Sequence, residues 1–88
     1  MIFEVRVKGK ALNYLKALDA KKKDRIKEVI LILEKDPVPF KACDVSKLKG
    51  YDNAYRIRIG DLRIVYEIIW HEKAILIDFI GPRGKAYK

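Results

Sequence analysis

The sequence has almost none of the residues from which most catalytic and metal sites are built. It contains one cysteine, Cys43, one histidine, His71, one serine, and no threonine or glutamine. A single cysteine excludes an intramolecular disulfide, and one cysteine with one histidine cannot complete a structural zinc site. We therefore interpret Cys43 as a small apolar filler and expect neither a metal nor a cofactor.

Long apolar segments are also missing. Residues 1–10, MIFEVRVKGK, lack the apolar stretch of a signal peptide, and the longest uninterrupted apolar run covers residues 29–33. With one unpaired cysteine, this predicts a cytoplasmic protein that does not associate with membranes. Charged residues make up 36% of the chain. Together with the absence of threonine and glutamine, this content is typical of a thermophilic source.

Positive charge is what the sequence has in excess. Lys and Arg number 20 against 12 Asp and Glu, so the net charge is +8 over 88 residues. Such a surplus favours a polyanionic or acidic partner, although charge alone fits a solvated surface equally well. The length predicts one domain, residues 1–88, in which a 50% hydrophobic content is enough for a core.

The hydrophobic periodicity changes once along the chain. Residues 1–8 alternate as in a half-buried strand, and residues 10–18 and 20–36 have helical spacing, with Asp19 as a cap between them. A proline-containing connector follows, with a brief strand or turn at residues 46–49. Three β-rich runs then cover residues 54–59, 62–70 and 73–80. The order β-α-α-β-β-β predicts an α+β fold: a twisted, mainly antiparallel four-stranded sheet with a helical hairpin on one face.

The short loop Gly60-Asp61 fixes the register of the first hairpin. It places Ile57 opposite Ile64 and Arg58 opposite Arg63. Side chains alternate across a strand, so two opposite faces follow. The helix-facing set is Ile57, Ile59, Ile64, Tyr66 and Ile68, and the open set is Arg56, Arg58, Arg63, Val65 and Glu67.

The facing arginines indicate a function. Like charges directly opposite destabilise a sheet by about 0.2–1 kcal/mol. We expect Glu67 and Asp78 to offset part of that repulsion, but they do not explain why both positions are arginine. Alternatively, each arginine only covers the sheet with its stem, which fits Arg56 best.

The second hairpin is expected to bring the C-terminal tail to the same place. With His71-Glu72 as its loop, Arg63 faces Ile80, and the tail GPRGKAYK leaves the sheet at the rim of the arginine pair. Arg83, Lys85 and Tyr87 then join the patch. Guanidinium groups bind phosphate and stack on bases, so arginine with an aromatic ring suits RNA or a single strand. We interpret His71 as a turn residue.

The block LKGYDNAYRIRIGDLRIVYEI and the ending GPRGKAYK, in this element order, resemble toxins of the RelE/ParE superfamily. The ending is similar to archaeal RelE-type toxins. The resemblance implies the toxin of a type II toxin–antitoxin system, a metal-independent mRNA interferase. It would act as a ribosome-dependent endoribonuclease on translated mRNA and inhibit translation. The implied partners are a cognate RelB-like antitoxin, the ribosome and mRNA.

The resemblance also assigns roles to residues. It implies Arg58, Arg63, Arg83 and Tyr87 as catalytic, with Arg63 and Arg83 stabilising phosphate charge and Arg58 acting at the leaving 5′-oxygen. The expected substrate-binding residues are Arg56, Lys85, Lys47 and Lys49. Two alternatives stay open: a ParE-like toxin directed at gyrase, and a non-catalytic basic RNA-binding domain whose binding falls with salt.

Overall fold

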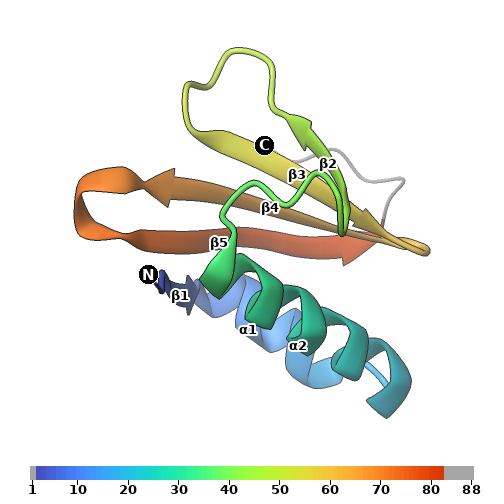
Figure 1. Cartoon of the computed structure of the whole chain (residues 1–88). Coiled ribbons are helices and arrows are strands. Elements are labelled where there is room, and N and C mark those ends of the chain that lie inside the picture. The colour runs from blue at the N-terminus through green and yellow to red at the C-terminus, as the bar shows by residue number, and fades with distance from the viewer. Residues whose placement is uncertain (1, 83–88) are drawn as a thin grey trace.

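The computed structural model describes residues 2–82, in which two helices pack on one face of a five-stranded sheet (Figure 1). The α+β class is confirmed. The elements are β1 (Glu4–Val7), α1 (Gly9–Ala17), α2 (Ala20–Lys35), β2 (Asp44–Lys47), β3 (Ala54–Ile59), β4 (Leu62–Ile69), the 3₁₀ turn η1 (Trp70–Glu72) and β5 (Ala74–Pro82).

The sheet has the order β1-β5-β4-β3-β2 and is mainly antiparallel, as expected; β1 alone pairs in parallel, with β5. The expected count of four strands is wrong, because β2 adds a fifth at the edge beside β3. Its four residues pair from Asp44 opposite Arg58 to Lys47 opposite Tyr55. The brief strand or turn expected at residues 46–49 is thus a strand, and it begins two residues earlier than expected. With Val45 as its one large apolar residue, it has too little alternation to fix its bounds from sequence.

The helices form because their apolar residues recur at helical spacing. Asp19 caps α2 as expected, its Oδ1 accepting a hydrogen bond from the backbone N–H of Lys22 at 2.9 Å. The helices and the sheet share one hydrophobic core. Its buried members include Ala11, Leu15, Ile26, Val29, Leu33, Ile57, Ile64, Tyr66, Ile68, Ile75 and Ile77. The expected helix-facing residues of β3 and β4 therefore do face the helices.

Tyr66 anchors the connector that follows α2. Its ring is fully buried and stacks on Tyr55, with ring centroids 5.8 Å apart. Its hydroxyl donates a hydrogen bond of 2.8 Å to the carbonyl oxygen of Pro37. Burial is the main cause that raises the pKa of Tyr66 far above its ordinary value. The connector is thus held on the helix side, where the half-buried Cys43 also packs against the core.

The first hairpin has the expected register. Arg58 lies opposite Arg63 and Ile57 opposite Ile64. Gly60 adopts a φ of +56°, which a tight two-residue loop requires at its first position.

The second hairpin follows the expected register only near its turn. Ile69 pairs with Ala74 as expected, but a bulge between Val65 and Tyr66 then shifts the pairing by one residue. Arg63 therefore faces Gly81, and the expected pairing with Ile80 is wrong. A bulge of this kind inserts one residue into a strand and needs no special residue type, so the sequence gives no sign of it.

Neither helix in residues 2–82 is long and apolar enough to cross a membrane.

Candidate nucleic-acid interface on the open face

Three arginines lie on the sheet face that points away from the helices, called here the open face. Arg56 and Arg58 come from β3, and Arg63 comes from β4 directly opposite Arg58. Each is half-buried. Alternation along the strands and the short loop between them bring these side chains together, so three of the expected site residues share one surface.

Arg58 is incompletely satisfied by the described part of the protein. Its Nε is buried and has no hydrogen-bond acceptor among residues 2–82. A buried donor without an acceptor costs roughly 1–3 kcal/mol. A guanidinium in this position gains most from an anionic ligand, because the ligand supplies both the acceptor and the charge.

The carboxylate placed to balance the arginines is not one of those expected. Asp44 of β2 lies directly across from Arg58. Glu67 and Asp78 are instead hydrogen-bonded to each other, and this bond is the main cause that raises the pKa of Glu67. Lys8 Nζ lies 2.7 Å from Asp78 Oδ1. Glu67 and Asp78 thus have each other and Lys8 as partners, and their offset of the arginine charge stays a prediction.

The loop between Arg58 and Arg63 is tied to the start of α2. Lys22 Nζ lies 3.2 Å from Asp61 Oδ2, and this hydrogen bond lowers the pKa of Asp61. Arg25 approaches the same loop, since a Cβ added to Gly60 would lie 3.0 Å from its Nη1. The lysine-rich start of α2 thus does more than face solvent: it supports the turn that places the arginines.

An aromatic ring lies beside the arginine pair. Phe79 faces Val65, and Gly81 faces Arg63. A Cβ added to Gly81 would lie 2.5 Å from Cζ of Phe79, so the ring covers the bare backbone of Gly81. Phe79 could not be placed here from sequence, because its position depends on the bulge. The ring adds a flat apolar surface beside the cationic one.

Gly81→Ala should displace the Phe79 ring and lower the free energy of unfolding by about 1 kcal/mol. Chemical denaturation of the wild type, Gly81→Ala, Phe79→Ala and the double variant measures the coupling. We expect the double variant to be less destabilised than the sum of the single variants, by about 0.5 kcal/mol or more. Strict additivity would show that the ring does not depend on Gly81.

The remaining expected site residues are not gathered at the arginines by the described structure. Lys47 lies opposite Tyr55 in the ladder, so its side chain is on the face away from Arg56 and Arg58. Lys49 is exposed in the loop after β2. The expected residues Arg83, Lys85 and Tyr87 lie outside the described residues.

His71 lies in η1, at the opposite end of β4 from Arg63, as expected for a turn residue. Its side chain is 84% exposed. It is therefore remote from the arginine pair and not placed to act as a base there. Residues 2–82 contain no group of three or more His, Cys, Asp or Glu side chains arranged to hold a metal ion.

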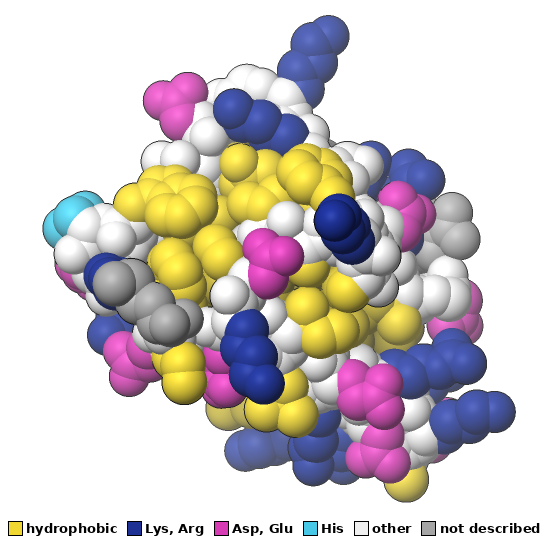
Figure 2. Space-filling view, in the orientation of Figure 1, with side chains coloured by type: hydrophobic (Ala, Val, Ile, Leu, Met, Phe, Trp, Pro, Cys, Tyr) yellow, Lys and Arg dark blue, Asp and Glu magenta, His cyan; other side chains and the backbone are white. Residues whose placement is uncertain are grey.

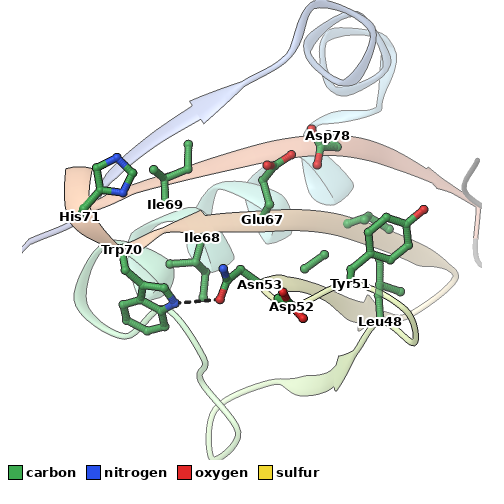
Figure 3. A pocket seen from close by; sticks show the side chains of 12 residues that line it. Leu48, Tyr51, Asp52, Asn53, Glu67, Ile68, Ile69, Trp70, His71 and Asp78 are labelled. Atoms are coloured by element: carbon green, nitrogen blue, oxygen red, sulfur yellow. Dashed lines mark hydrogen bonds between the residues drawn. The ribbon is translucent and has the colours of Figure 1, made fainter.

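A hollow lies on the open face beyond the arginines, toward η1 (Figure 3). Its volume is about 680 Å³. Trp70 Nε1 donates a hydrogen bond of 3.1 Å to Asn53 Oδ1, which joins η1 to the β2–β3 loop along the side of the hollow. The sequence did not reveal it, because its walls come from segments that only the fold brings together.

Comparisons with known proteins identify the family. Residues 5–87 match the family model of the ParE toxin of type II toxin–antitoxin system, parDE. A Methanocaldococcus jannaschii protein assigned as toxin RelE1 is 38% identical over 88 residues, covering 100% of this chain and 98% of the relative. The chain belongs to the RelE/ParE toxin family. The expected family resemblance is confirmed.

The fold of this RelE/ParE toxin is similar to solved structures of archaeal proteins. The toxin in the RelE–RelB complex of Pyrococcus horikoshii OT3 is 36% identical, with a TM-score of 0.86 over 98% of this chain and 100% of that one. The chain matched in the RelB–RelE complex of Methanococcus jannaschii is 27% identical, with a TM-score of 0.73 over 89% of each chain. This chain is thus a RelE-type toxin of the type II class, and the fold expected for it is confirmed apart from β2.

Proposed function

We propose that this toxin is a ribosome-dependent endoribonuclease that cleaves translated mRNA and thereby inhibits translation. The observation that carries the proposal is the facing pair Arg58 and Arg63 on the open face, with a buried Arg58 Nε that lacks an acceptor within residues 2–82. Both features suit a phosphate that brings negative charge and acceptor oxygens together. The two relatives at 36% and 38% identity carry the RelE name.

The proposed mechanism is electrostatic. Cleavage through the 2′-hydroxyl removes a proton from that group, places extra charge on the phosphorus oxygens, and returns a proton to the 5′-oxygen. Arg63, with Arg83, stabilises the extra charge. Arg58 donates a hydrogen bond or proton to the leaving 5′-oxygen, and Arg56 orients the phosphate. Tyr87 stacks on a base or assists deprotonation.

The ribosome supplies what the site lacks. Arginine is a weak acid, and the one histidine of the chain is remote from the pair. A site of this kind is slow unless the reacting atoms are held in line. Orientation of the mRNA by the ribosome contributes that part of the rate, because a fixed near-attack geometry removes much of the entropic barrier.

The proposed protein partner is a RelB-like antitoxin, and the proposed location is the cytoplasm. The Pyrococcus and Methanococcus relatives were solved as complexes with RelB. Hydrophobic side chains form a broad patch on the side shown in Figure 2, with Lys and Arg mostly around its edge. Among the exposed hydrophobic residues, Leu31 is 60% and Phe40 is 66% exposed. A broad exposed apolar patch, unlike single exposed residues, is typical of a surface that a partner covers.

One comparison tests the proposal. The toxin is incubated with a defined mRNA on programmed ribosomes, with the same mRNA alone, and with gyrase in a supercoiling assay. We expect cut mRNA in the ribosome sample, little in the free mRNA sample, and unchanged supercoiling. Inhibited supercoiling would establish the ParE-like alternative. Salt-sensitive RNA binding with no cut product in either RNA sample would establish the non-catalytic one.

A further inference from the structure

The hollow near η1 is built from several separate parts of the chain, among them β5, which supplies Asp78. The β2–β3 loop supplies Leu48 and Tyr51, β4 supplies Val65, Glu67 and Ile69, and η1 supplies Trp70 and His71. Figure 3 labels most of these side chains around one space, with the Trp70–Asn53 hydrogen bond along its side. A volume of about 680 Å³ with mostly apolar walls is typical of a binding site for a small group.

The charge in this hollow is opposite to that of the chain. The net charge is +8, yet the lining contains Asp52, Glu67 and Asp78, with no Lys or Arg among the described residues that line it. Lys8 offsets the charge of Asp78, so Asp52 and Glu67, between apolar walls, are the source of a locally negative potential. Such a potential repels the phosphates of RNA and attracts a cation, so the hollow and the arginine pair select opposite ligands on one face.

Glu67 and Asp78 lie together in the lining of the hollow, where an additional cation can reach them. Figure 3 shows the two carboxyl groups pointing toward each other. Lys8 Nζ lies 2.7 Å from Asp78 Oδ1, so a cation already covers Asp78 from outside the hollow. The contact with Asp78 is the main cause that raises the pKa of Glu67, because two carboxyl groups placed together disfavour a second negative charge. A cation that enters the hollow beside Glu67 relieves that repulsion.

The lining residues indicate which kind of cation fits the hollow. An apolar stem suits Leu48, Val65 and Ile69, and a charged tip suits the carboxylate of Glu67. Lysine and arginine side chains have this form, with a chain of methylene groups that ends in a charged head.

We propose that this hollow binds a lysine or arginine side chain of an antitoxin segment that crosses the open face. The inference rests on the proposed antitoxin partner and adds the chemistry of one contact. Glu67 is four residues from Arg63 along β4, or about 13 Å at about 3.3 Å per residue. An extended segment that also neutralises the arginines therefore carries a carboxylate about four residues from its cation.

Trp70 reports occupancy directly, because it lines the hollow, is 48% exposed and is the one tryptophan of the chain. The probes are the peptides acetyl-Leu-Lys-Leu-amide and acetyl-Leu-norleucine-Leu-amide, which differ in the charged head. Titrations at pH 7 follow the fluorescence and the indole N–H resonance of Trp70. We expect the lysine peptide to bind with a Kd about tenfold lower than its neutral analogue.

Two variants locate that preference. Glu67→Gln should remove most of the tenfold difference, whereas Glu28→Gln, an equal charge change on the exposed side of α2, should retain it. Circular dichroism confirms that both variants fold. Equal affinity for the two peptides, or no Trp70 response to either at about 10 mM, would overturn the proposal.

A second measurement separates the antitoxin from the ribosome as the source of the cation. Glu67→Gln should retain the wild-type rate of ribosome-programmed cleavage, because the hollow is not part of the proposed phosphate site. A tenfold or larger loss of cleavage with a folded variant would assign the hollow to ribosome or RNA binding, and the proposal would be wrong. The peptide titrations need no RNA. They therefore still test the binding of a cation in the hollow if the nuclease proposal fails.

Discussion

Replacing Arg58 and Arg63 together by alanine should lower the rate of ribosome-programmed mRNA cleavage by about 10³-fold. Removing one preorganised donor to a developing negative charge costs about 10²–10³-fold, and two donors acting on one phosphate are not additive. The fold should persist, because the substitution also removes a like-charge pair that costs about 0.2–1 kcal/mol. Single-turnover cleavage on programmed ribosomes measures the rate, and chemical denaturation measures the stability.

The matched control is Arg6→Ala with Lys35→Ala. It removes the same charge from positions away from the open-face pair: Arg6 pairs with Glu4 on β1, and Lys35 is exposed at the end of α2. This control should cleave at close to the wild-type rate. Lysine at positions 58 and 63 should give an intermediate rate, because it keeps the charge but loses the planar fork of donors. Wild-type cleavage by Arg58→Ala/Arg63→Ala would remove both residues from the mechanism.

Ile64→Ala should lower the free energy of unfolding by about 2–5 kcal/mol, the largest stability effect we expect from a single substitution in the sheet. Ile64 is fully buried and pairs with Ile57 on one side and Ile80 on the other. Truncation leaves a cavity between three strands and the helices, and close-packed neighbours refill it only in part. Urea denaturation with two independent probes measures the change.

Leu31→Ala is the control for that substitution. Leu31 is on α2 but is 60% exposed, so its truncation removes little buried apolar area. We expect a change within about 0.5 kcal/mol, as for most surface substitutions. A loss as large as that of Ile64→Ala would mean that the free protein covers Leu31 with another surface, and that Ile64 is not a special core position.

The parts of the site that were predictable are those fixed by neighbours in sequence. Gly60 supplies the positive φ of a two-residue loop, and a loop of that length determines that Arg58 lies opposite Arg63. Asp19 caps α2 because its side chain reaches a backbone N–H three residues on. The hairpin register and the helix cap each depend on a few adjacent residues. Contacts with distant segments do not change the conformations that these residues favour.

The predictions of strand register and strand count were wrong where a segment distant in sequence determines the local structure. The bulge at Val65 and Tyr66 changed the partner of Arg63 from Ile80 to Gly81, and it placed Phe79 near the arginines. β2 is a strand because an edge of β3 is available to it, and its own residues contain little alternation. The hollow likewise required η1 and the β2–β3 loop to meet through Trp70 and Asn53.

The α+β class, the face that packs on the helices and the pairing of two arginines could be predicted from the residue pattern, because periodicity and tight-turn chemistry are local. The sequence also identified the family through residues that lie in that hairpin and the tail. The tertiary structure alone decided which carboxylates lie near which cations. Glu67 and Asp78 join Lys8 rather than the arginines, and Lys22 reaches Asp61, because packing the helices on the sheet sets distances between side chains remote in sequence.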